Sequence, residues 1–144
     1  MAEYIIPTDT SCDFTPDYLK QHHIPFVTLS FSIDGVTGEN GCPSSDVLKN
    51  FYDKMRAGSM TKTQQASIED TEKVFREILK EGKDILHIAF SSGLSGTANA
   101  ARLAAENMME EFPGRKIIVI DSLCASLGQG LLVDSALKLQ PQGK

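Results

Sequence analysis

Apolar residues along this 144-residue chain form short β-branched runs and longer segments with helical spacing. The short runs predict buried strands at residues 4–6, 26–33, 85–90 and 117–120. Helical spacing, bounded by capping residues, prolines or glycines, predicts helices over residues 15–23, 44–56, 67–82, 97–112 and 126–139. Asp34 and Gly35 predict a two-residue hairpin turn, and the polar segment 59–66 is expected to be an extended loop.

The order of these elements, β-α-β-β-α-α-β-α-β-α, predicts a single α/β domain. Helices that separate consecutive strands favour a largely parallel sheet with helices on both faces. The run 85–90 is nearly all apolar, which is typical of a strand covered on both sides. Residues 38–43, with their glycines and proline, are expected to form a loop.

The composition fits one soluble domain and limits the kinds of partner that it can bind. Hydrophobic residues make up 41% of the chain and charged residues 23%, which argues against a disordered chain. The net charge of -5 offers no basic stripe, so we expect no nucleic-acid partner. Cys12, Cys42 and Cys124 lie far apart and are expected to be small hydrophobes in a reducing compartment. Without a secretory pattern or a long apolar run, we expect a cytoplasmic location and no transmembrane segment.

Polar residues gather where three of the predicted strands end, at 8–11, 91–96 and 121–122. Ligands of parallel sheets bind at the carboxyl ends of the strands. The segment 91–96 (SSGLSG) leads from a strand into a helix, where backbone N–H groups and the helix dipole favour an anion. By spacing alone, a tight turn with a serine cap and no ligand explains this segment equally well. The segment 61–67 (TKTQQAS), taken alone, favours an exposed loop with an N-cap.

Known catalytic and nucleotide-binding motifs do not match the 91–96 turn. No lysine follows Gly96, and Thr97 stands where a GxSxG nucleophile elbow needs its last glycine. No histidine follows His87, which itself lies in an apolar strand pattern typical of a packed core residue. The enzyme alternative is a metal-dependent phosphate-ester hydrolase or transferase that uses Asp9, with the 91–96 turn as its anion cradle.

Five segments occur in an order that carries a family resemblance: 8–13 (TDTSCD), 33–35 (IDG), 63–67 (TQQAS), 91–97 (SSGLSGT) and 120–130 (IDSLCASLGQG). Together they resemble the DegV family of bacterial fatty-acid-binding proteins, which are similar to the carrier partner of fatty acid kinase. The resemblance spans essentially the whole chain. It implies a DegV-like N-terminal α/β domain that carries a long-chain fatty acid to a partner kinase for acyl phosphorylation. It implies no catalytic residue, metal or cofactor besides the bound lipid.

The resemblance also implies that Thr63 and Ser92 bind the carboxylate of the fatty acid. The residues expected to shape the pocket around them are Asp9, Ser91, Gly93, Leu94, Ser95 and Gly96. Hydroxyl and N–H donors at a helix start suit a carboxylate without a buried lysine or arginine. The acyl chain needs an apolar slot, which Phe31, Ile33 and Leu94 are expected to line.

The chain departs from the family in two loops and in length. Gln64 and Ala66 differ from the usual TSQPS, and Leu123 and Cys124 take positions that are often small or polar. Family members are longer and carry a second domain over the acyl tunnel. We therefore expect residues 1–140 to form the N-terminal domain and 140–144 a tail, with the second domain absent. A further alternative is a remnant that binds no lipid and forms a homodimer through apolar surface left exposed.

Overall fold

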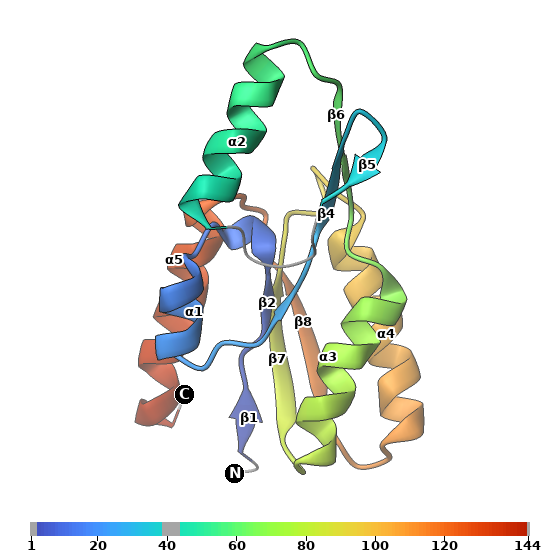
Figure 1. Ribbon diagram of the computed structural model, residues 1–144. Coiled ribbons are helices and arrows are strands. Elements are labelled where there is room, and N and C mark those ends of the chain that lie inside the picture. Colours follow the sequence, from blue (N-terminus) through green and yellow to red (C-terminus); the bar gives the residue numbers. More distant parts are fainter. Residues whose placement is uncertain (1–2, 39–43, 144) are drawn as a thin grey trace.

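The computed structural model describes residues 3–38 and 44–143 and contains a parallel sheet at its centre (Figure 1). Strand β1 (Tyr4–Ile5) pairs in parallel with β7 (Asp84–Ala89), which pairs in parallel with β8 (Ile117–Asp121). Strand β2 (Thr8–Asp9) follows β1 and pairs in parallel with β3 (Phe26–Val27). The Ile88 N–H still donates to the Pro7 carbonyl at 3.1 Å, so the N-terminal segment joins the two parallel groups.

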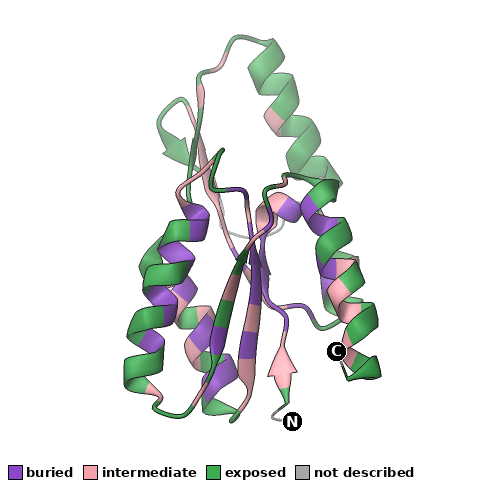
Figure 2. Cartoon of the chain, turned by 180° about the vertical axis from the view of Figure 1, so that it is seen from behind, coloured by how far each residue is buried: buried purple, intermediate pink, exposed green. Residues whose placement is uncertain are grey.

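Helices cover both faces of this parallel layer, as the sequence predicts (Figure 1). Helices α1 (Pro16–Gln21) and α5 (Leu127–Leu139) lie on one face, and α3 (Ile68–Lys80) and α4 (Thr97–Glu111) lie on the other. Figure 2 shows that buried residues gather on the helix faces turned toward the strands. The fold class predicted from the sequence is therefore confirmed.

Alternation along β7 divides the core into two clusters. Ile85 packs on the α3 and α4 side, among buried residues such as Phe75 and Met108. Ile88 packs on the α1 and α5 side with Leu19 and Val133, because odd and even positions of a strand point to opposite faces. The two clusters hold the carboxyl ends of the central strands in a fixed arrangement.

The helix boundaries follow from capping residues that the sequence displays. The Thr15 hydroxyl accepts a hydrogen bond from the Tyr18 N–H at 3.2 Å, and Pro16 occupies the first turn of α1. The Ser67 hydroxyl caps α3 by accepting from the Asp70 N–H at 3.0 Å. Gly82 follows α3 with φ of 76°, the left-handed conformation that glycine adopts without strain.

A smaller antiparallel unit projects beyond the carboxyl ends of the parallel strands (Figure 1). It consists of β4 (Ser30–Ile33), β5 (Val36–Thr37) and β6 (Thr61–Gln64), with β4 in the middle, and of helix α2 (Ser45–Arg56). The predicted turn at Asp34 and Gly35 joins β4 to β5, with φ of 50° and 82°. Residues 39–43, the greater part of the predicted loop, and Cys42 with them, lie outside the described residues.

Two sequence expectations need correction here. Residues 26–33 form two strands of different sheets, because the Leu29 N–H donates to the Thr10 hydroxyl at 3.0 Å and takes the chain out of the first ladder. Residues 61–64 were expected to be a loop but form β6, paired with β4 from Thr61 to Gln64. Polar side chains on both faces of β6 hide the alternation that marks a half-buried strand.

The C-terminal helix ends at Leu139, as expected, and continues as a short 3-10 helix, η2 (Gln140–Gln142). The Gln140 side chain donates to the Tyr4 carbonyl at 2.5 Å, so the start of the predicted tail is fixed to β1. Cys12 is buried and Cys124 is half-buried, and Cys124 is a free thiol. Within the described residues, no helix is long and apolar enough to cross a membrane.

Candidate functional site

The turn that joins β7 to α4, residues 91–96, is held in shape by its own backbone donors. The N–H groups of Leu94 and Ser95 donate to the Ser91 carbonyl at 3.0 and 3.1 Å, and the Gly93 N–H donates to the Ser91 hydroxyl at 3.2 Å. The Ser91 N–H donates to the Cys124 carbonyl at 3.1 Å. These N–H groups are engaged within the protein. An anionic ligand at this turn therefore depends on side-chain hydroxyls more than the sequence suggests.

Ser92 is the exposed hydroxyl of the turn, and Asp121 at the end of β8 lies beside it. One oxygen of Asp121 accepts hydrogen bonds from the N–H groups of Ser92 and Leu123, both at 3.1 Å. Hydrogen bonding from the Ser92 side chain, followed by these N–H groups, lowers the pKa of Asp121 below its usual range. Ser92 therefore stands next to a carboxylate that is ionised at neutral pH.

Asp9 shapes the turn from beneath. Its carboxylate is fully buried and accepts hydrogen bonds from the Phe90 N–H at 2.8 Å and the Ser11 N–H at 3.1 Å. The Ser11 hydroxyl also contacts it. These contacts cap the 3-10 helix η1 (Thr10–Cys12) and fix the end of β7 just before the turn. The carboxylate satisfies neighbouring loop amides and does not line an open surface.

Thr63 lies on β6, directly opposite Phe31 of β4. Opposed residues of an antiparallel pair share a face, so the exposed Thr63 hydroxyl and the Phe31 ring lie on the same side of the small sheet. The Phe31 ring packs edge-on against Phe51 of α2, with centroids 5.1 Å apart. Ile33 lies two residues along β4 on this face. A hydroxyl group therefore borders an apolar surface made by β4 and α2.

The residues that follow Thr63 bring β6 against the 91–96 turn. The Ala66 N–H donates to the Thr97 hydroxyl at 3.3 Å at the start of α4. The Gln65 side chain lies so close to Gly96 that a Cβ atom there would collide with it. The same Thr97 hydroxyl lies 2.9 Å from that of Ser95. The two segments that carry Thr63 and Ser92 thus meet at one end of the parallel sheet (Figure 1).

The sequence profile of the DegV family, described as uncharacterised proteins, matches residues 4–144. The chain belongs to the DegV family. A DegV domain-containing protein of Clostridium perfringens is 36% identical over 144 residues, which are 100% of this chain and 50% of that protein. The chain thus spans about half the length of this curated relative.

Solved structures of related proteins have backbones similar to that of this chain. A protein from Eubacterium ventriosum, described as binding stearic acid, is 30% identical, with a TM-score of 0.87. The match covers 97% of this chain and 48% of that one. A DegV family protein from Thermus thermophilus, described by its fatty acid binding, is 32% identical with a TM-score of 0.84, covering 100% and 49%.

Sequence reasoning on this DegV-family chain overlooked Gln129, which is fully buried on α5. Its amide nitrogen lies 3.1 Å from the Thr8 hydroxyl and 3.3 Å from the Ile88 carbonyl, and the Ser11 hydroxyl lies 2.9 Å from its amide oxygen. Gln129 thereby links β2, β7 and η1 beneath the site. The only signal in the sequence was its place between two glycines, Gly128 and Gly130, in the family segment.

His87 is a core residue of this DegV domain, as the strand pattern predicts. It is fully buried and packs edge-on against Phe75, with centroids 5.3 Å apart. Burial lowers the pKa of His87 from 6.5 to about 4, although the Asp9 carboxylate and the Pro7 carbonyl partly oppose the shift. Within the described residues, neither ring nitrogen has a partner at hydrogen-bond geometry.

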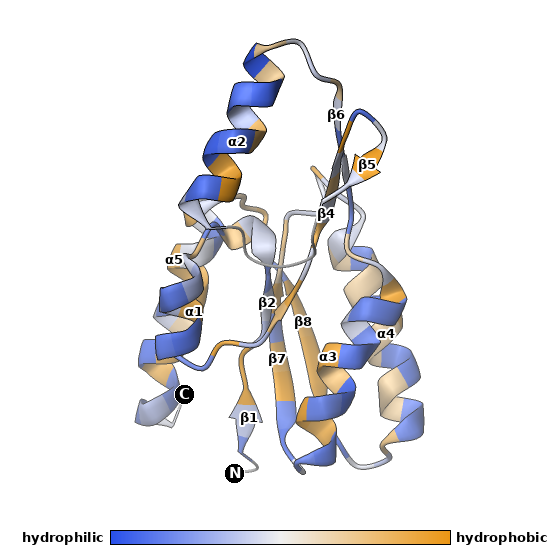
Figure 3. Ribbon diagram, viewed as in Figure 1, coloured by the Kyte–Doolittle hydropathy of each residue, from blue (hydrophilic) through white to orange (hydrophobic). Residues whose placement is uncertain are grey.

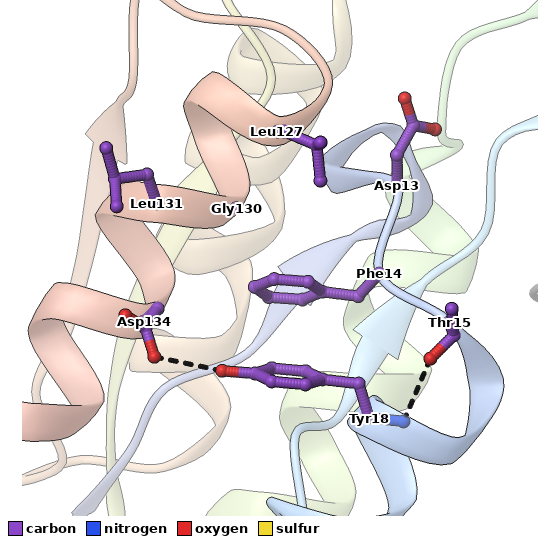
Figure 4. A pocket seen from close by; sticks show the side chains of 8 residues that line it. All are labelled: Asp13, Phe14, Thr15, Tyr18, Leu127, Gly130, Leu131 and Asp134. Atoms are coloured by element: carbon purple, nitrogen blue, oxygen red, sulfur yellow. Dashed lines mark hydrogen bonds between the residues drawn. The ribbon is translucent and has the colours of Figure 1, made fainter.

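A hollow of about 460 Å³ lies between α1 and α5 (Figure 4). Two of its polar side chains bond to each other, since the Tyr18 hydroxyl donates to Asp134 at 2.9 Å. A second hollow, of about 730 Å³, lies between α3 and β3. None of the eight site residues predicted from the sequence lines either hollow.

Proposed function

We propose that this chain binds a long-chain fatty acid at the end of the sheet where the segments that carry Thr63 and Ser92 meet. The hydroxyls of these two residues hold the carboxylate, and the acyl chain lies along the apolar face shared by β4 and α2. Two related solved proteins are described as fatty-acid-binding, one of them with stearic acid. They support the ligand class, while the position of the carboxylate is a proposal that rests on the geometry of this chain.

The observation that carries the proposal is the uncovered apolar stripe of α2. None of the twelve residues of α2 is buried. Four large side chains along it remain 41–50% exposed, namely Val47, Leu48, Tyr52 and Met55. Figure 3 shows α2 as a largely hydrophilic helix interrupted by hydrophobic segments. An acyl chain that covers this stripe removes apolar surface of both partners from water, at about 0.8 kcal/mol per methylene.

The hydroxyl donors suit the head group of such a ligand. A carboxylate accepts charge-assisted hydrogen bonds, which are stronger than bonds between neutral groups. Thr63 borders the apolar face, so a carboxylate bound there directs its chain over Phe31 and toward α2. In this role the chain is a lipid carrier without a catalytic group, and a partner kinase would phosphorylate the acid that it presents.

The position of Asp9 counts against the alternative phosphate-ester enzyme. That mechanism needs the Asp9 carboxylate to face the substrate, whereas its oxygens are buried and occupied by Ser11 and Phe90. The carrier proposal requires only that Asp9 keep the turn in shape.

Mass spectrometry of lipid extracted from the purified protein tests the proposal. We expect a co-purified fatty acid, or stoichiometric uptake of added oleate by delipidated protein. Size-exclusion chromatography with and without oleate then separates a carrier from a chain that only dimerises. Absence of both lipid and uptake would contradict the proposed function.

A further inference from the structure

Asp121 is a charged group that bonds directly to the backbone of Ser92, one of the two proposed head-group residues. Its side chain is only 16% exposed, and it accepts hydrogen bonds at 3.1 Å from the backbone of Ser92 and of Leu123. A partly buried carboxylate is screened less by solvent and salt than an exposed one. Any ligand that binds the Ser92 hydroxyl therefore binds within the field of Asp121.

The surrounding charges do not neutralise this field. Arg102 of α4 lies 3.8 Å from the second oxygen of Asp121, but its side chain is 45% exposed. Asp9, fully buried beneath the turn, adds a second carboxylate. Around the 91–96 turn, two carboxylates against one guanidinium leave an excess of negative charge, although the proposed ligand is itself an anion.

We propose that Asp121 selects the head group by charge, so that this site accepts a carboxylate and disfavours a phosphate monoester. The inference rests on the proposed function and adds a specificity determinant to it. A phosphate monoester carries about -1.5 to -2 charge at neutral pH, against -1 for a carboxylate. The additional charge meets the same nearby carboxylate and raises the free energy of the complex.

A pair of ligands with the same chain measures this selection without any mutation. Hexadecanoate and hexadecyl phosphate compete, below their micellar concentrations, for a bound fluorescent fatty acid at pH 7.5. We expect hexadecyl phosphate to bind about tenfold or more weakly than hexadecanoate, since one extra charge at short range has an effect of that order. Equal affinities overturn the inference and leave fatty-acid binding intact. If neither ligand binds, the proposed function fails and this inference fails with it.

Two variants, one that removes a negative charge and one that removes a positive charge, separate a charge effect from damage to the turn. Asp121→Asn is expected to bring the affinities for the two ligands at least about fivefold closer, because it removes the repelling charge. Arg102→Gln should move them further apart, because it removes the compensating one. Glu110→Gln, at the far end of α4, changes net charge equally and should leave the ratio as in the wild type. If Asp121→Asn does not fold, Arg102→Gln still decides, because an unchanged affinity ratio in that variant contradicts selection by charge. If both variants fold, a shift of the ratio in the same direction in both also contradicts it.

Discussion

At the scale of single residues, Ser92 and Asp121 share one hydrogen-bonding system. The Ser92 N–H and side chain both bond to Asp121, so a ligand carboxylate competes with Asp121 for the hydroxyl proton. Hydrogen bonds to charged groups contribute roughly 1.5–3 kcal/mol. In the free turn these donors already serve the carboxylate of Asp121, which a ligand carboxylate must displace from the hydroxyl.

Removing the Ser92 hydroxyl should weaken fatty-acid binding. We expect Ser92→Ala to raise the Kd for oleate more than tenfold, because a charge-assisted hydrogen bond is lost. Ser135→Ala is the matched control, since Ser135 is an exposed serine of α5 whose hydroxyl donates to the Leu131 carbonyl of its own helix. Isothermal titration of both variants measures the effect. An unchanged Kd in Ser92→Ala would show that Ser92 does not hold the carboxylate.

His87 should make the stability of the fold depend on pH. Its pKa is about 4 in the folded chain and 6.5 when unfolded, so between these values only the unfolded chain binds the proton. The free energy of unfolding therefore falls as the pH drops from 6.5 to 4, by about 3 kcal/mol in total. His87→Leu removes this component and is expected to unfold with equal or greater free energy at pH 7, because it removes two buried ring nitrogens that have no partner at hydrogen-bond geometry among the described residues.

Urea titrations at pH 7 and pH 4.5 measure that difference. The wild type should lose more stability between the two values than His87→Leu does. His22→Gln, which replaces an exposed histidine of the same protein, is the control and should lose as much as the wild type. If all three proteins lose the same amount, the buried imidazole is not the source of the dependence.

At the scale of elements, the regular helices and buried strands could be predicted from the sequence because local signals agree with tertiary packing. Caps such as Thr15 and Ser67, and the apolar run in β7, each indicate one structure. Strand β6 could not be predicted, because its polar residues are exposed on both faces and its strand state comes from hydrogen bonds to β4. The break between β3 and β4 likewise depends on the distant Thr10 hydroxyl.

The same division applies to the candidate site. Its residues could be proposed from the order of short polar segments and the resemblance that they carry. The sequence could not show that the N–H groups of the 91–96 turn are engaged internally, or that Asp9 is buried beneath it. Both facts arise from hydrogen bonds to residues distant in the sequence, such as that between Asp9 and Phe90, 81 residues apart, or from the exact path of the turn.

Helices α2 and α3 should respond to mutation in opposite ways. Leu48 of α2 is 41% exposed, so Leu48→Gln should change the free energy of unfolding by less than about 0.5 kcal/mol. The same change should raise the Kd for oleate severalfold, because it removes part of the apolar stripe. Leu79→Ala in α3, at a position 3% exposed, should instead cost about 2–5 kcal/mol of stability.

Chemical denaturation and oleate titration of both variants measure the two quantities. A large loss of stability in Leu48→Gln would mean that α2 packs more tightly than its exposure indicates. Unchanged oleate affinity would place the acyl chain somewhere other than along α2. The combination of a stable fold and weak binding is the expected signature of a helix that serves the ligand.

At the scale of the whole molecule, the two parts of the fold have different sources of stability. The parallel layer has its own core on both faces, formed by Phe75, Met108 and their neighbours on one side and by Leu19 and Val133 on the other. Helix α2 of the smaller antiparallel unit has no buried residue, and it contacts β4 through the rings of Phe51 and Phe31. Such a unit gains most from a ligand that supplies the missing apolar contact.

Thermal unfolding with a series of saturated fatty acids tests this coupling. A ligand that binds only the folded chain stabilises it by about 2.7 kcal/mol at a concentration 100 times its Kd. Because each buried methylene contributes roughly 0.8 kcal/mol, we expect Tm at a fixed ligand concentration to rise from dodecanoate to hexadecanoate. Methyl hexadecanoate, which keeps the chain but has no carboxylate, should raise Tm less. A Tm increase that is the same for all chain lengths would mean that the carboxylate binds while the acyl chain stays in solvent, and the apolar stripe of α2 would then need another partner.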